Sequence, residues 1–151
     1  MKSLHLLVLS GAAAVMLSGL PAAVLHAASN EPIDTSAVQL EQQQQNGIAY
    51  LSGGIGLDES RAIQQAKGYS LHMTFSTGPG NKYVPDVDVA IQNMQGHSVL
   101  TLSQVGPIVY VQLPPGKYVI VATRNGHEQR GSVELKGGTI GDLNLHWSDA
   151  T

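Results

Sequence analysis

Hydrophobic and polar residues follow one another along this chain with more than one period, and each period predicts a different element. Apolar and polar side chains alternate at residues 69–76, 87–91 and 140–147. Because successive side chains of a strand point to opposite faces of a sheet, this period of two predicts half-buried strands. Short segments rich in apolar and β-branched residues predict further strands at 48–51, 99–102, 108–113, 118–123 and 132–135.

Glycine, proline and asparagine interrupt these runs at short intervals, which is typical of turns between strands. Asn125-Gly126 is the strongest hairpin signal, because a type I′ turn requires positive φ at both central residues. The other predicted turns lie at 77–81, 93–97, 106–107, 114–116 and 137–138. Short strands with turns at this spacing predict an antiparallel sandwich or barrel.

Residues 57–67 are the best candidate for a helix. Asp58 and Glu59 fall in its first turn, where carboxylates suit the positive end of the helix dipole. Gly68 is placed to end the helix in the left-handed conformation. The apolar residues that can share one face are Leu57, Ala62, Ile63 and Ala66.

The segments that precede the first predicted strand differ in polarity. Residues 1–27 combine Lys2, an apolar stretch and a cleavage position after Ala27, which is the order of a cleavable signal peptide. Pro21 breaks the stretch before it reaches the roughly 20 apolar residues of a spanning helix. Residues 28–46 are polar, with glutamines at 42–45, and are predicted to be mobile with transient helix around 38–45.

Composition excludes several kinds of partner and of chemistry. The net charge is −3 and the basic residues are not clustered, so nucleic acid and anionic membrane surfaces are not expected partners. The chain has no cysteine, which excludes disulfides, thiolate metal sites, a cysteine nucleophile and acylation of a leader cysteine. No second hydrophobic stretch is long enough to span a bilayer. The mature protein is therefore expected to be free in the periplasm or secreted, without a membrane anchor.

Residues 113–122 read Leu-Pro-Pro-Gly-Lys-Tyr-Val-Ile-Val-Ala. This hairpin resembles the L-P-x-G-x-Y-x-V-x-A motif of the carboxypeptidase regulatory-like domain, a transthyretin-like β-sandwich. The resemblance spans 83–147, where the run at 87–91 is similar to an early hairpin of that family and the turn at 125–126 to a later one. It implies an accessory, interaction or stabilising module without catalytic residues.

The chain departs from this family in two places. Residues 103–107 replace a polar T-D-x-x-G-like segment, and 48–76 lie outside the common core. The whole chain is also similar to small exported bacterial proteins that join such a segment to this sandwich. We predict a mainly β protein, an antiparallel transthyretin-like β-sandwich with one N-terminal helix packed beside it. Its predicted parts are a signal peptide (1–27), a mobile polar segment (28–46), a strand–helix–strand segment (47–82) and the sandwich (83–147), with 47–147 as one globular unit.

Two features are candidates for a binding site. Gly53, Gly54 and Gly56 precede the predicted helix, where free backbone N–H groups can hold a phosphate or carboxylate. The lysine and serine or threonine of a P-loop are missing, so a tight strand-to-helix turn is the alternative interpretation. Tyr83 and Trp147 lie at strand ends and are candidates for an exposed aromatic patch, whereas core packing is favoured for the other aromatics.

Other polar residues do not form a recognisable catalytic or metal-binding pattern. Asp86 and Asp88 share a strand face and could bind calcium or form an acid/base pair, but the favoured interpretation is solvent-facing charges that discourage edge pairing. No serine lies in a nucleophile-elbow pattern. The histidines beyond the predicted leader do not have a metal-binding spacing; they are His72, His97, His127 and His146. His72 and His146 can meet only if their strands are neighbours. We predict no catalytic residue, no metal site and no cofactor.

The sequence therefore favours an exported, non-enzymatic accessory or protein-interaction module, whose partner is another exported or envelope protein. A small-ligand or carbohydrate-binding protein, using the turn at 53–56 or the exposed aromatics, is the first alternative. A hydrolase or metalloenzyme is the second.

Overall fold

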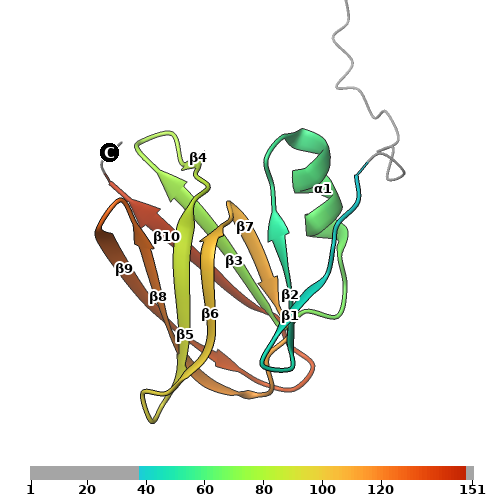
Figure 1. Cartoon of the computed structure of the whole chain (residues 1–151), viewed down its shortest axis with the longest axis vertical. Coiled ribbons are helices and arrows are strands. Elements are labelled where there is room, and N and C mark those ends of the chain that lie inside the picture. The colour runs from blue at the N-terminus through green and yellow to red at the C-terminus, as the bar shows by residue number, and fades with distance from the viewer. Residues whose placement is uncertain (1–37, 149–151) are drawn as a thin grey trace, which may run out of the picture. The chain divides into compact units, whose positions relative to one another are not determined.

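The computed structural model describes residues 38–148, which lie within one compact unit. The signal peptide predicted at 1–27 and residues 28–37 of the polar segment lie outside the described residues. The described part is mainly β, as predicted, with a single short helix (Figure 1). Its elements are β1 (Gln43–Gln45), β2 (Ile48–Gly53), α1 (Leu57–Gln65), β3 (Leu71–Thr77), β4 (Lys82–Tyr83), β5 (Val87–Asn93), β6 (Ser98–Val105), β7 (Ile108–Val111), β8 (Gly116–Arg124), β9 (His127–Leu135) and β10 (Gly141–Trp147).

The strands form two sheets, which Figure 1 shows as separate layers. The first sheet has the order β1-β2-β7-β3-β10, and β4 pairs with the end of β3. The second has the order β6-β5-β8-β9, and all its neighbouring strands are antiparallel. Helix α1 lies beside β2 at the side of the first sheet (Figure 1).

One strand pair contradicts the prediction of an antiparallel arrangement. β10 pairs with β3 in parallel, from Gly141 opposite Leu71 to Trp147 opposite Thr77. β9 and β10 are consecutive along the chain but belong to different sheets, so the connection at 136–140 carries the chain between sheets and does not form a hairpin. Side chains alternate in the same way in parallel and antiparallel strands, and the sequence pattern therefore does not reveal the direction of β10.

The main hydrophobic core draws side chains from both sheets. In the first sheet, Leu71, Met73 and Phe75 of β3 are fully buried, as their alternation predicts. The second sheet contributes alternate residues of β5, β6 and β8: Val87, Val89, Ile91, Leu100, Leu102, Tyr118, Ile120 and Ala122. Full burial of one such side chain contributes roughly 1.5–3 kcal/mol, so this shared core holds the two sheets together.

A second, smaller cluster lies on the opposite face of the first sheet, against α1. Ile63 is the buried residue of α1, with 0% of its surface exposed. The other buried members of the cluster are Leu51, Tyr69, Ile108 and Tyr110. β7 is therefore covered on both faces, since Val109 and Val111 point into the main core. This explains the unbroken apolar run of β7.

The helix is shorter than the predicted 57–67 and ends at Gln65, because Ala66 is extended with ψ 137°. Gly68 has a positive φ of 94°, but it lies beyond the end of the helix and does not cap it. The prediction that Leu57 joins the apolar face is wrong, since its side chain is 63% exposed. Leu57 and Ile63 are separated by about 120° around the helix axis and point to different sides.

The end of the polar segment is a strand and not a mobile or helical stretch. Residues 43–45 form β1 and pair with β2 across Asn46-Gly47, so the prediction for 28–46 is wrong at this end. These turn residues have φ of 52° and 75°, and Asn125-Gly126 have 49° and 79°. The hairpin predicted at 125–126 is thus confirmed, and the same Asn-Gly signal marks the one at 46–47.

Side chains of the glutamine run at 42–45 connect this segment to other parts of the fold. Gln42 Oε1 accepts a hydrogen bond of 2.8 Å from the hydroxyl of Tyr69. Gln45 Oε1 accepts one of 2.8 Å from the backbone N–H of Thr101, in β6 of the other sheet. Because amide groups make these contacts, a search for hydrophobic periodicity does not detect the strand.

Candidate functional site

The turn between β2 and α1 is closed by side chains of the helix itself. The backbone N–H of Ile55 donates a hydrogen bond of 2.9 Å to Glu59 Oε2. The Ser60 hydroxyl donates to the carbonyls of Gly54, at 2.8 Å, and Gly56, at 2.7 Å. Gly54 and Gly56 have φ of 103° and 88°, a conformation that side chains other than hydrogen disfavour.

This geometry bears on the anion site predicted at Gly53, Gly54 and Gly56. A Cβ atom on Gly53 would lie only 2.8 Å from Glu59 Oε1, so the Glu59 carboxylate lies directly over the turn. An anion at the Ile55 N–H would compete with that carboxylate and be repelled by it. The arrangement resembles a capping box, in which a glutamate at the third helical position reaches back to the N-terminal backbone. The geometry favours the alternative interpretation, a tight strand-to-helix turn.

A groove of about 630 Å³, which we call the α1–β4 groove, opens beside this turn. One wall comes from the turn and α1, and the other comes from β4 and the residues near it. The groove brings together Gly54, Gly56 and Tyr83, which the sequence proposed separately, and it leaves out Gly53 and Trp147. The remaining lining residues are Ile55, Leu57, Ser60, Arg61, Gln64, Lys82, Pro85 and Pro107.

Exposed hydrophobic side chains gather at this groove. Ile55 is 69% exposed, Leu57 is 63% exposed and Tyr83 is 44% exposed. The other large hydrophobic side chains exposed within 38–148 are Met94 and Ile140, which do not line it. Single exposed apolar residues are ordinary on protein surfaces, whereas a group of them in one hollow makes that hollow a candidate binding site. The hydrophobic pattern of the sequence does not indicate this exposed group, because it places Leu57 on the buried face of the helix.

The groove is also positively charged. Arg61 from α1 and Lys82 from β4 line it, and no aspartate or glutamate does. Neither cation lies within ion-pair distance of a carboxylate in the described part of the chain. This contrasts with the net charge of −3 of the whole chain.

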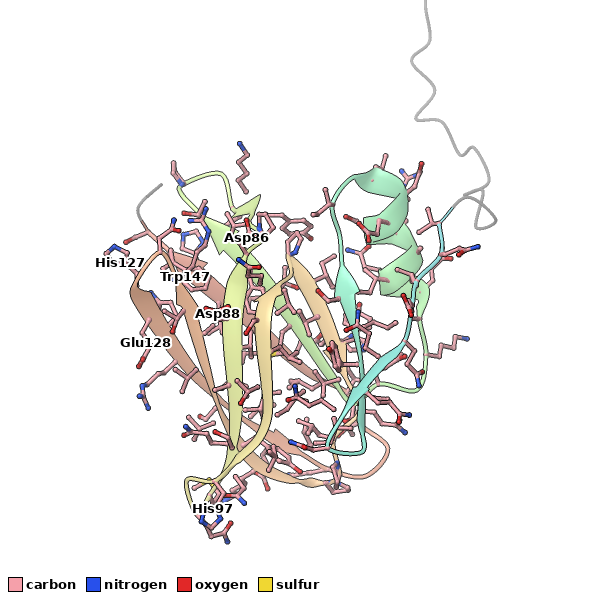
Figure 2. All side chains as sticks on the ribbon, in the orientation of Figure 1. Asp86, Asp88, His97, His127, Glu128 and Trp147 are labelled. Atoms are coloured by element: carbon pink, nitrogen blue, oxygen red, sulfur yellow. The ribbon has the colours of Figure 1, made fainter. Side chains whose placement is uncertain are left out.

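Trp147 is a core residue, and the prediction that it contributes to an exposed aromatic patch is wrong. Only 5% of its surface is exposed, and its ring packs edge-on to Phe75 with centroids 6.4 Å apart. The indole Nε1 donates a hydrogen bond of 3.0 Å to the carbonyl of His127. Figure 2 shows Trp147 at the end of β10, next to the β8–β9 hairpin that carries His127. The sequence places Trp147 at a strand end, where exposure is expected, but the β8–β9 hairpin of the other sheet covers that end.

His72 lies flat against Tyr110 on the face of the first sheet that carries the second cluster. The ring centroids are 3.5 Å apart and the planes differ by 5°. Burial lowers the pKa of His72, although the Asp142 carboxylate, 3.7 Å from Nδ1, acts in the opposite direction. Burial raises the pKa of Tyr110, and the negative charge of Asp142 adds to that effect. Both shifts favour an uncharged stack.

His72 and His146 do lie on neighbouring strands, but the register keeps them apart. His72 is opposite Asp142, and Ser76 is opposite His146, with Ser76 Oγ 3.0 Å from His146 Nδ1. The two histidines are therefore roughly 13 Å apart along the strands, too far to share a metal ion. The Ser76–His146 contact has the reach of a nucleophile and its base, yet Ser76 is 8% exposed and so presents little surface to a substrate.

The remaining polar candidates do not converge. Asp88 Oδ1 accepts a hydrogen bond of 2.9 Å from the backbone N–H of Gln104, and Asp86 precedes β5 with a φ of 60°. Figure 2 shows His97 and His127 at opposite ends of the second sheet. Between residues 38 and 148, no group of three or more histidine, cysteine, aspartate or glutamate residues is placed to hold a metal ion. Among the same residues, no helix is long and apolar enough to cross a membrane.

Comparisons with known proteins add little to this geometry. No family model matches the chain, and no curated protein matches it. Among solved structures, the Bacillus anthracis TIE protein is similar with a TM-score of 0.37 and 20% sequence identity. The similarity covers 52% of this chain and 16% of that one. A TM-score this low does not establish a shared fold, so the groove itself is the basis for a functional proposal.

Proposed function

We propose that this protein is an exported, non-enzymatic interaction module that binds a segment of another exported or envelope protein in the α1–β4 groove. The observation that carries the proposal is the convergence of Ile55, Leu57 and Tyr83 on one hollow of about 630 Å³. Removing these side chains from water on binding supplies the hydrophobic driving force that most protein association uses. Export itself rests on the leader sequence at 1–27.

The exposure of the groove favours a protein segment over a small molecule. Small-molecule sites bury about 70–90% of the ligand in an enclosing cleft. Here, the lining residues Ile55 and Leu57 remain 69% and 63% exposed, which suits a larger surface that covers them. The small-ligand alternative retains one favourable observation, which is that the volume of about 630 Å³ is typical of ligand pockets.

We further propose that the two sheets form a transthyretin-like sandwich of the carboxypeptidase regulatory-like type. The residues of the matching hairpin support this. The Tyr118 hydroxyl donates a hydrogen bond of 2.8 Å to the carbonyl of Pro114, which ties the tyrosine to the turn that precedes it. Tyr118, Ile120 and Ala122 point into the core shared by both sheets. Such a domain is an accessory module in the family that it resembles, in keeping with a binding role.

Photocrosslinking in the periplasm or culture medium tests the proposed function. A photoreactive amino acid placed at Leu57 lies in the groove, and one at Met94 is a matched control, since both side chains are 63% exposed. We expect a discrete adduct with one exported protein from position 57 and not from position 94. Equal labelling from both positions, or no adduct from 57, would contradict a protein-binding groove. A thermal-shift screen then tests the small-ligand alternative, because a bound small ligand raises the melting temperature of the protein by mass action.

A further inference from the structure

The α1–β4 groove carries one cation on each wall. Arg61 comes from α1, in the wall that also holds Ile55 and Leu57, and Lys82 comes from β4, in the wall that holds Tyr83. A chain segment lying between the walls therefore meets hydrophobic surface and positive charge on both sides. Arg61 can hold a carboxylate through two parallel hydrogen bonds, and Lys82 offers a compact ammonium group.

The carboxylates nearest to the groove in sequence do not line it, and the closest of them, Glu59, is already held by the backbone of the turn. Glu59 accepts a hydrogen bond from the Ile55 N–H and lies over Gly53, outside the lining of the groove. Asp58 and Asp86 are sequence neighbours of lining residues but do not line the groove themselves. Both cations thus remain available to a ligand, in a chain whose net charge is otherwise negative.

We infer that the α1–β4 groove selects an acidic segment in which aliphatic side chains alternate with carboxylates. The inference rests on the proposed function and adds the chemistry of the partner. Aliphatic side chains would cover Ile55, Leu57 and Tyr83, while carboxylates would pair with Arg61 and Lys82. A basic segment would meet like charge from both walls, so the same arrangement excludes it.

Three labelled peptides of equal length test this inference by fluorescence anisotropy with the purified protein. One alternates leucine with glutamate, the second replaces glutamate with glutamine, and the third replaces it with lysine. The first two have nearly the same shape and apolar content, so their difference in affinity reports charge alone. We expect the acidic peptide to bind about tenfold more tightly than the glutamine peptide, from two partly exposed ion pairs. The lysine peptide should bind most weakly.

Charge variants of the protein assign that preference to the groove. In the double variant Arg61→Gln/Lys82→Gln, the acidic and glutamine peptides should bind within about twofold of each other, because both ion pairs are gone. The matched control Lys117→Gln/Lys136→Gln removes two exposed cations that lie outside the groove and should keep the preference. Raising the ionic strength from about 0.1 M to about 1 M should also remove it, since the screening length falls from about 10 Å to about 3 Å.

Two results would overturn the inference. One is equal binding of the acidic and glutamine peptides by the unmodified protein, and the other is an equal loss of preference in both double variants. Either result leaves the proposed function standing if Leu57→Ser weakens the binding of every peptide and Met94→Ser does not. Such a pattern would leave a groove that binds apolar segments without selecting their charge. If crosslinking from position 57 also fails, the proposed function fails with it.

Discussion

The attachment of α1 to the first sheet depends on one side chain, Ile63, and its removal gives a sharp test of how the groove is built. Ile63 is the buried residue of the helix, with 0% exposure, and it packs in a small cluster with Leu51 and Ile108. Replacing a buried isoleucine with alanine costs about 2–5 kcal/mol in general. We expect roughly 2–3 kcal/mol here, because the cluster is small and can partly collapse into the space. A helix as short as α1 is not stable alone in water, so this loss should detach it.

Urea unfolding and amide hydrogen exchange measure this effect together. The Ile63→Ala variant should lower the free energy of unfolding by roughly 2–3 kcal/mol and speed exchange in α1 more than in β5 or β8. Leu57→Ala is the matched control, since it removes an exposed aliphatic side chain from the same helix and should change stability by less than about 0.5 kcal/mol. The groove should also lose its peptide affinity in Ile63→Ala, because α1 forms one wall. A loss below about 1 kcal/mol for Ile63→Ala, with exchange in α1 unchanged, would refute the view that this side chain anchors the helix.

Two further predictions concern the rest of the fold. Gln45→Ala should lower the free energy of unfolding in urea by about 1 kcal/mol, because it leaves the Thr101 N–H in β6 without its acceptor. Gln44→Ala should lower it by less than about 0.5 kcal/mol. Equal losses in the two variants would show that the Gln45 side chain does not stabilise the connection between β1 and β6. His72 has a lowered pKa in the folded chain, so the unfolded chain binds its proton more readily and stability should fall as the pH drops below about 6.5. Urea unfolding at about pH 7 and about pH 5 should show a smaller fall for His72→Phe than for the unmodified chain, and an equal or larger fall in the variant would contradict this assignment.

The candidate groove contains some residues that local sequence patterns single out and others that they do not. Turn chemistry singles out Gly54 and Gly56, and a place at a strand end singles out Tyr83. All three line the groove. Trp147 satisfied the same strand-end argument but is buried, because the hairpin at 125–126 covers it from the other sheet. The exposure of a side chain at a strand end depends on whether the other sheet covers that end. The local sequence pattern does not contain that information.

Arg61, Lys82 and Leu57 show a second reason for missed residues. They lie on two elements that are separated in sequence and meet only because β4 pairs with the end of β3. Their individual residue types carry no signal, since exposed cations and leucines are common on any surface. Only the tertiary structure therefore shows that these two cations line the same groove.

Local sequence determined the period-two strands, the hairpin at 125–126 and the helix near residue 60, because hydrophobic alternation and positive-φ turn residues act within a few positions. Tertiary structure decided which strands became neighbours, so that β10 runs parallel to β3, the glutamine run forms β1 and Trp147 is buried. It also created the α1–β4 groove by bringing residues of α1 and β4 to one hollow. The physical reason is that strand pairing and burial depend on contacts between distant residues, whereas propensity and periodicity report only what each segment would do against a generic apolar surface.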